Sequence, residues 1–242
     1  MSAEIVTRRR LLHWYQPGHA HFITYRLAGS IPDVLLLEWR RERAELIRQA
    51  GSLPYDVRAE RRSEIERQFF KRYDDLLDQS TENRCLADDR VASIVRDNLY
   101  HHNGDKYQLL AYCVMPNHVH VLLQPFQIDA AAGHHLQATS DEIADSSGPL
   151  ASIMHSLKSY TANKANEVLG RHRAFWQHES YDHWVRDLDE RDRIVEYIRF
   201  NPVRARLCER PIDWRFSSAF DRFHQDGSDC ALVGWLRDDW KR

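Results

Sequence analysis

Two histidines, His118 and His120, stand one residue apart in the apolar stretch AYCVMPNHVHVLLQP at residues 111–125. If this stretch forms a β-strand, side chains two residues apart share a face, so both imidazoles can reach one metal ion. Neutral imidazole is a suitable ligand for Mn, Zn, Ni or Cu, and at least one further ligand has to come from elsewhere in the fold. The spacing alone is a weak signal, because a half-exposed strand can carry two histidines without a metal.

A second set of candidate residues lies at 150–169, where apolar residues recur at helical spacing. Tyr160 and Lys164 stand one turn apart on this apolar stripe. A buried ammonium group is unfavourable unless water or an anion contacts it or the residue has a functional role. A phenol has a pKa of about 10 in water, and a nearby cation or metal favours the phenolate. Tyr160 is therefore a candidate nucleophile, although a core tyrosine is a good alternative interpretation.

These residue types together suit the metal-assisted attack of a tyrosine on a phosphodiester. A metal would polarise the scissile phosphate, the phenolate would form a covalent phosphotyrosine, and a sugar 3′-oxygen would leave. Tyr181, in the segment FWQHESYDHWVR, could compete with Tyr160 on residue type alone. The predicted helix around Tyr160 favours Tyr160.

Local patterns predict the elements that position these residues. The segment HAHFITYRL at 19–27 is rich in aromatic and β-branched residues and predicts a first strand. Residues 105–115 and 118–125 predict two further strands, which the pair Pro116-Asn117 joins as a β-hairpin. Residues 33–100 are dense in Arg and Glu with scattered apolar residues, and they predict two or three exposed helices that serve as scaffold.

The segments after this hairpin predict a connection and another helix. Small and polar residues without periodicity at 126–148 favour a mobile connection. Asp187, with Glu190 three residues later, forms a capping pattern that begins a helix. That helix should end near Asn201 and Pro202, because the residue before a proline disfavours helical backbone.

Composition sets the class of protein. The chain has 242 residues, of which 43% are hydrophobic and 29% charged, as in ordinary globular domains. No apolar run approaches the roughly 20 residues of a membrane span and no secretory signal is apparent, so we expect a cytoplasmic protein. The four cysteines are far apart, which argues against a thiolate zinc site or a disulfide framework. The formal net charge of −2 does not by itself indicate DNA binding.

The motifs VMPNHVHVLL, SLKSYT, FWQHESYDHWVR and YIRFNPVRARL, in this order and approximate spacing, resemble those of the REP-associated tyrosine transposases, within the single-tyrosine HUH transposases with an IS200-like domain. The resemblance implies a single α+β domain over 1–242, built on a ferredoxin-like antiparallel sheet with helices on one face. Its core strands and catalytic helix fall within 13–29 and 105–207. A helical insert at about 33–100 and a C-terminal extension complete the chain.

The resemblance also implies an enzyme that nicks and rejoins single-stranded DNA at palindromic REP-type hairpins through a 5′-phosphotyrosine intermediate, using Mg²⁺ or Mn²⁺. By position, it makes His118 and His120 metal ligands and Tyr160 the nucleophile. Lys164, from its place one turn after Tyr160, is predicted to be catalytic as well. Relatives often take a third ligand from an amide side chain about one helical turn after the tyrosine. Here either Asn163 fills that role or the site differs.

Arginines and a polar-aromatic segment are candidates for DNA contacts. Aromatic side chains can stack on unpaired bases and arginines can hold phosphates, so 175–215 is a reasonable DNA-contacting surface, with core packing as an equal alternative. Arg206 stands where relatives commonly have glycine. The predicted DNA-binding residues are Arg8, Arg9, Arg10, Lys158, Trp176, His178, Arg199, Arg204 and Arg206.

Two other functions are compatible with the same residues. One is a hairpin-binding protein that keeps the fold but has weak or no catalytic turnover. The other is a metal phosphodiesterase that releases its product without a covalent intermediate. In each case the expected partner is single-stranded or hairpin DNA and not a membrane, and the chain acts as a monomer or a homodimer.

Overall fold

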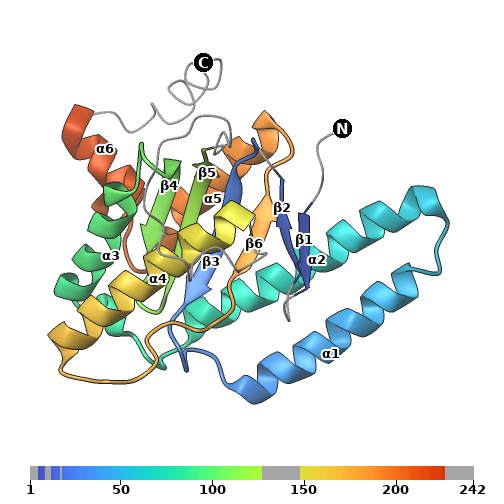
Figure 1. Ribbon diagram of the computed structural model, residues 1–242, viewed down its shortest axis with the longest axis horizontal. Helices are drawn as coiled ribbons and strands as arrows, with labels where there is room; N and C mark the ends of the chain where they lie inside the picture. The colour runs from blue at the N-terminus through green and yellow to red at the C-terminus, as the bar shows by residue number, and fades with distance from the viewer. Residues whose placement is uncertain (1–4, 9–11, 17, 127–147, 227–242) are drawn as a thin grey trace, which may run out of the picture.

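The computed structural model describes residues 5–8, 12–16, 18–126 and 148–226. Its centre is a four-stranded antiparallel sheet with the strand order β4-β5-β3-β6 (Figure 1). The strands are β3 (His21–Arg26), β4 (Tyr107–Val114), β5 (His118–Pro125) and β6 (Tyr181–Trp184). With helices between β3 and β4 and between β5 and β6, this is the ferredoxin-like βαββαβ arrangement. The predicted α+β class and antiparallel sheet are confirmed.

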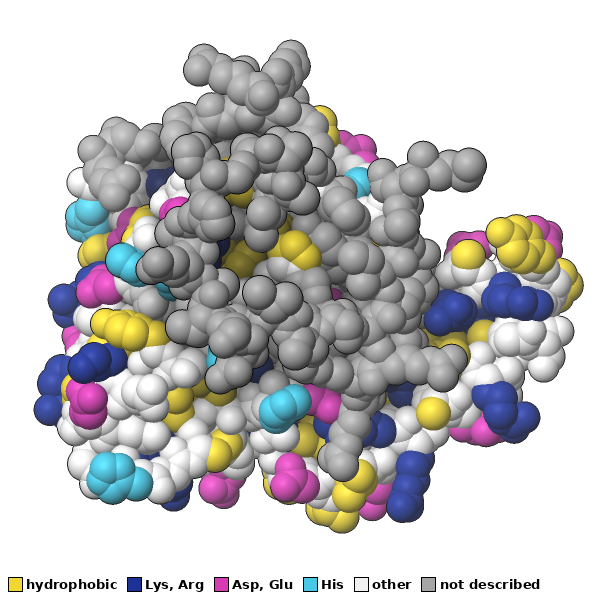
Figure 2. Space-filling view, in the orientation of Figure 1, with side chains coloured by type: hydrophobic (Ala, Val, Ile, Leu, Met, Phe, Trp, Pro, Cys, Tyr) yellow, Lys and Arg dark blue, Asp and Glu magenta, His cyan; other side chains and the backbone are white. Residues whose placement is uncertain are grey.

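Three helices fill the connection between β3 and β4, as predicted for the insert. They are α1 (Asp33–Ala50), α2 (Tyr55–Gln79) and α3 (Asp89–His101), with the short 3₁₀ helix η1 (Cys85–Ala87) before α3. The antiparallel pair α1 and α2 extends away from the sheet in Figure 1. On the face that Figure 2 shows, basic and acidic side chains alternate over this hairpin, so it presents no surface of a single charge there.

Strand β5 has two different faces because successive side chains alternate. Val119, Val121 and Leu123 point into a core that α3 and α4 (Gly148–Leu169) cover, and Figure 1 shows α4 in front of the sheet. The core helices α3 and α4 therefore lie on one face, as predicted. His118 and His120 point to the other face of the sheet.

That other face is covered by α5 (Leu188–Arg204), and α2 also reaches it. Asp187 caps α5 by accepting a hydrogen bond from the backbone N–H of Glu190, as the capping pattern predicted. Val195 and Ile198 of α5 share a core with Leu122 of β5. Helices thus cover both faces of the sheet.

The predicted end of α5 is slightly too early. The helix passes through Pro202 and ends at Arg204. A proline this close to the C-terminus deprives only one carbonyl of its intrahelical donor, and its fixed φ is compatible with helical backbone.

The remaining elements extend the core at both ends. Strands β1 (Ile5–Arg8) and β2 (Leu12–Tyr15) form a separate hairpin, and η2 (Pro211–Asp213) and α6 (Ser218–Asp226) form the C-terminal extension. Cys85, Cys113 and Cys208 have free thiols, and Cys230 lies outside the described residues. The predicted connection at 126–148 also lies outside them, apart from its two end residues. In the part of the chain described, no helix is both long and apolar enough to cross a membrane.

Candidate active site

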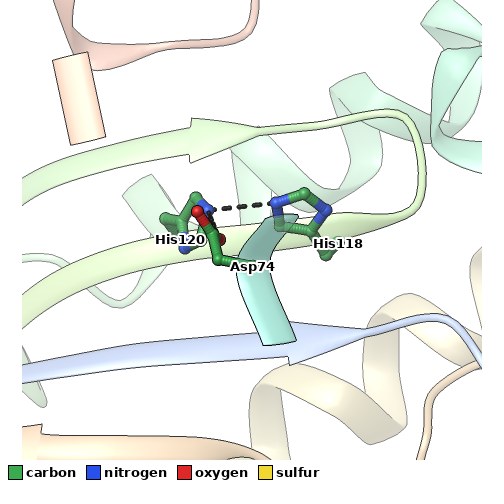
Figure 3. Close-up of side chains that lie close together, drawn as sticks. All are labelled: Asp74, His118 and His120. Atoms are coloured by element: carbon green, nitrogen blue, oxygen red, sulfur yellow. Dashed lines mark hydrogen bonds and ion pairs between the residues drawn. The ribbon is translucent and has the colours of Figure 1, made fainter. Parts of the chain in front are cut away.

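Asp74, His118 and His120 form a compact group of buried side chains, shown in Figure 3. Their potential ligand atoms all lie within 4.8 Å of one another. The Nε2 atoms of the two histidines are 3.0 Å apart, and Nε2 of His120 lies 3.2 Å from Oδ1 of Asp74. Two imidazoles and a carboxylate that converge in this way can hold a divalent cation. The structure therefore places the two predicted histidine ligands together and adds an acidic residue from α2.

Hydrogen bonds at the Nδ1 atoms orient both imidazoles. The side-chain amide of Asn117 donates from Nδ2 to the carbonyl oxygen of Leu77 (2.8 Å), so its Oδ1 faces Nδ1 of His118 (2.7 Å) and accepts that proton. Oγ1 of Thr24 lies 2.8 Å from Nδ1 of His120. When both Nδ1 atoms carry protons, the Nε2 lone pairs face each other, and a shared cation would relieve this unfavourable contact.

The pKa shifts in this group favour the protonation states that bind metal. Burial lowers the pKa of His118 well below its usual value, and the neighbouring His120 adds to this effect while Asp74 opposes it. Burial by itself raises the pKa of Asp74, but the neighbouring His120, His118 and Tyr197 hydroxyl lower it, to about 2. A neutral His118 beside an ionised Asp74 is what coordination of a divalent cation requires.

Asp74 was missed at the level of sequence because its helix was interpreted as scaffold. One signal was present: Asp74, Asp75 and Asp78 follow one another near the C-terminal end of α2, and the last turn contains no basic residue. Acidic side chains are unfavourable at that end of a helix, where the dipole is negative. Three such residues therefore need either burial with a partner or a ligand.

Tyr197 on α5 is in direct contact with this group. Its hydroxyl group donates a hydrogen bond to Oδ2 of Asp74, and its ring centroid lies 5.4 Å from that of His120. Burial raises the pKa of Tyr197, the Asp74 carboxylate raises it further, and Arg204 opposes the shift. A cation that neutralised Asp74 would bring this pKa down.

Asn201 stands one helical turn after Tyr197 and is fully buried. Neither its side-chain oxygen nor its nitrogen has a hydrogen-bond partner among the described residues. An orphaned buried amide is costly, and its oxygen is a suitable ligand for a hard cation. The relation that the resemblance implied, an amide one turn after the tyrosine, therefore occurs here and not at Tyr160 and Asn163.

The structure does not bring Tyr160 to the histidines. Helix α4 packs on the opposite face of the sheet, against Val119 and Val121, and Tyr160 is 51% exposed. The expectation that α4 faces the histidines is wrong, because the alternation along β5 turns the imidazoles away from it. Asn163 is exposed on the same helix, so it cannot join His118 and His120 within this chain.

Two other tyrosine and lysine candidates have structural roles. Lys164 is not on the buried stripe of α4: its side chain is 47% exposed and pairs with Glu167 at 2.9 Å. Tyr181 packs against Phe22 and Phe70, with ring centroids 6.3 and 4.4 Å away, and burial raises its pKa.

Two of the residues predicted to bind DNA are instead engaged inside the protein. Trp176 is buried, and its indole N–H donates to Oγ1 of Thr161 at 2.9 Å, so it cannot stack on a base in this structure. Lys158 donates to the carbonyl oxygens of Gln177 and His178, both at 3.1 Å. Burial, with Arg26 nearby, lowers the pKa of Lys158 to about 8 although Glu179 opposes the shift.

The remaining predicted DNA contacts have different environments. His178, Arg204 and Arg206 are exposed, whereas Arg199 is mostly buried and lies 3.8 Å from Glu196. Arg206 has a φ of 58°, the left-handed region that favours glycine, which explains why glycine suits this position. Arg9 and Arg10 lie outside the described residues. Arg8 is the last residue of β1, and only its backbone is described.

Comparisons with known proteins agree with the motif resemblance. A protein of Haemophilus influenzae, provisionally named a REP-associated tyrosine transposase, is 23% identical over 120 residues. The chain is similar to a REP-associated tyrosine transposase. The match covers 50% of this chain and 61% of the relative, so it spans less than two thirds of that protein. No family model matches the sequence.

A solved structure can be compared as well. It is a REP-associated tyrosine transposase bound to a REP hairpin, with a TM-score of 0.41 and 17% sequence identity. The alignment covers 89% of this chain and 82% of that one.

Proposed function

We propose that this protein is a metal-dependent transposase that cleaves and rejoins single-stranded DNA at REP-type hairpins, with Tyr197 as the nucleophile. The observation that carries the proposal is the hydrogen bond from Tyr197 to Asp74, within the buried group that contains His118 and His120. The similarity to a REP-associated tyrosine transposase supports the class of substrate. The proposal replaces Tyr160 with Tyr197.

Three converging side chains fit a divalent cation, and a fourth, one helical turn after Tyr197, is proposed to join them. Asp74, His118 and His120 would supply a carboxylate oxygen and two imidazole nitrogens, and the unpaired amide of Asn201 would supply an oxygen. Of the two cations that the resemblance implies, Mn²⁺ suits this mixed set of oxygen and nitrogen donors better than Mg²⁺, which prefers oxygen ligands. When bound, the metal would polarise the scissile phosphate and stabilise the charge that develops on it.

The residues of the chain can carry out the covalent step. The phenolic oxygen of Tyr197 forms a bond to phosphorus, the bond from phosphorus to the 3′-oxygen breaks, and a 5′-phosphotyrosine results. The hydrogen bond to Asp74 orients the phenolic oxygen. Over the whole step the phenolic proton is lost and the 3′-oxygen gains one, so it leaves as a 3′-hydroxyl. Because the phosphotyrosine keeps the phosphodiester linkage, a free 3′-hydroxyl can attack it and restore Tyr197, which rejoins DNA.

One chain supplies the whole proposed site. The histidines come from β5, Asp74 from α2, and Tyr197 and Asn201 from α5. A monomer would therefore be sufficient for cleavage. Location in the cytoplasm stays a prediction of the sequence.

The test is to incubate the protein with end-labelled single-stranded oligonucleotides that contain REP-like hairpins, in the presence of Mn²⁺. A covalent adduct that survives denaturation, mapped to Tyr197 by mass spectrometry, is the expected result. An adduct on Tyr160 would refute the assignment of the nucleophile. Cleaved product without an adduct would identify a metal phosphodiesterase, and tight hairpin binding without cleavage would identify a binding protein.

A further inference from the structure

A second polar feature lies beside the histidine pair. It is a small hollow, partly open to solvent, whose wall includes Asp78, Arg84, Asn117, His118, Ala205 and Leu207. His118 belongs both to this wall and to the proposed metal site. The hollow and the metal site are therefore adjacent.

One exposed arginine lines this hollow, and two more are sequence neighbours of a residue that lines it. Arg84 lines it directly, and Arg204 and Arg206 flank Ala205, which also lines it. The guanidinium of Arg204 lies 4.8 Å from the ring centroid of Tyr197. Nothing in the described ranges shows any of the three within ion-pair distance of a carboxylate, in contrast to many arginines of the insert. Unpaired guanidinium groups around a hollow favour a bound anion.

Asp78 is the one acidic residue in the wall. Burial raises its pKa to about 7, Asp74 and Asp75 act in the same direction, and Arg204 opposes them. Its charge is therefore weaker near neutral pH than that of an ordinary aspartate.

We infer that this hollow binds a phosphate of single-stranded DNA next to the scissile phosphate, with Arg84 as the main contact. The inference rests on the proposed function, because a strand cleaved at Tyr197 must continue past the metal site on one side. The hollow shares His118 with that site, and its wall contains Arg84, whose exposed guanidinium can hold a phosphate. Arg84 belongs to the insert, so the insert would contribute to substrate binding as well as to the metal site.

The test measures binding of a fluorescent oligo(dT) strand by anisotropy at several salt concentrations. Loss of one phosphate contact lowers the slope of log K against log salt by about 0.7 for a single strand. Arg84→Ala is expected to weaken binding and to lower the slope by this amount, and Arg84→Lys to restore part of both. Asp78→Asn is expected to strengthen binding, because it removes a negative charge from the wall.

The matched control is Arg41→Ala, which removes an exposed arginine of α1 in the same insert. Circular dichroism establishes that each variant is folded. If Arg84→Ala and Arg41→Ala bind oligo(dT) alike, the hollow is not a phosphate site, even when the Tyr197 adduct forms. If Arg84→Ala shows the expected loss and no adduct forms with any hairpin, the hollow is supported and the proposed nucleophile fails.

Discussion

The hydroxyl group of Tyr197 donates a hydrogen bond to Asp74, although the two residues are 123 positions apart in the chain. Asp74 comes from the insert and Tyr197 from the helix that follows β6, and both helices meet over the face of the sheet that carries the histidines. The insert is therefore part of the proposed active site. It cannot be treated as a scaffold that could be removed.

Substitution of the tyrosines separates the two candidate nucleophiles. Tyr197→Phe keeps the ring that packs against Phe22 and Phe70 but removes the attacking oxygen. We expect the covalent DNA adduct to be lost, because phenylalanine has no oxygen that can form the bond to phosphorus. Tyr160→Phe changes an exposed side chain on the far face and should leave the adduct unchanged. Gel electrophoresis of the labelled, denatured complex measures both, and an adduct that persists in Tyr197→Phe would contradict the assignment.

Metal binding should stabilise the fold. A ligand that binds only the folded state adds about 2.7 kcal/mol to the free energy of unfolding at a concentration 100 times its Kd. We expect Mn²⁺ to raise the midpoint of urea unfolding in the wild-type protein and to have little effect on Asp74→Asn or His118→Ala. Asp75→Asn is the control, because Asp75 is adjacent in sequence but outside the buried group. Equal stabilisation of Asp74→Asn and wild type would remove Asp74 from the ligand set.

Asn117 should affect both the metal site and the end of α2. Its Oδ1 accepts the Nδ1 proton of His118, and its Nδ2 donates to the carbonyl of Leu77 at the last turn of the helix that carries Asp74. Loss of such a ligand-orienting group typically lowers metal affinity by about 10-fold to 100-fold. Asn117→Ala should show this loss in calorimetric titration with Mn²⁺.

A second variant separates the two roles of Asn117. Asn117→Asp keeps an acceptor for His118 but cannot donate to Leu77. It should bind Mn²⁺ more tightly than Asn117→Ala while losing about 1 to 3 kcal/mol of stability, the usual cost of an unsatisfied buried partner. Equal Mn²⁺ affinity in Asn117→Ala and wild type would show that Asn117 has a structural role only.

The sequence was sufficient for the central strands β3, β4 and β5, for the helices of the insert, for α4 and α5, and for the histidine pair, because each depends on local patterns. The alternation HVHVLL fixes that His118 and His120 share one face of β5 and that Val119 and Val121 share the other. Periodicity does not say which helix covers which face. That choice depends on tertiary packing, which is why Tyr160 was assigned to the wrong side of the sheet.

The other residues of the site differ in whether they could have been identified from the sequence alone. Tyr197 and Asn201 are separated by one helical turn in the segment YIRFN, so the pair could have been recognised from sequence. For Asp74 the acidic end of α2 was a signal, but nothing local specifies that α2 crosses the sheet beside β5, so the sequence could not place Asp74 at the histidines. The assignment of Trp176 to DNA failed because a buried aromatic residue and an exposed one look alike in sequence.

The stability of the metal-free protein should fall as the pH decreases, partly because of His21. This residue is fully buried at the start of β3, and burial lowers its pKa to about 4 although Asp182 opposes the shift. The unfolded chain takes up the proton near pH 6.5, so between about pH 6.5 and 4 the unfolded state binds more protons and stability is lost. At pH 5 this linkage amounts to about 2 kcal/mol.

Urea unfolding in the presence of a chelator, at pH 7.5, 6 and 5, measures this loss. His21→Leu should be less sensitive to pH than wild type, with the remaining dependence due in part to the buried His118. His155→Leu, which changes an exposed histidine of α4, should keep the full dependence. Identical pH profiles for wild type and His21→Leu would show that the burial of a neutral His21 does not contribute, because only that group differs between them in this pH range.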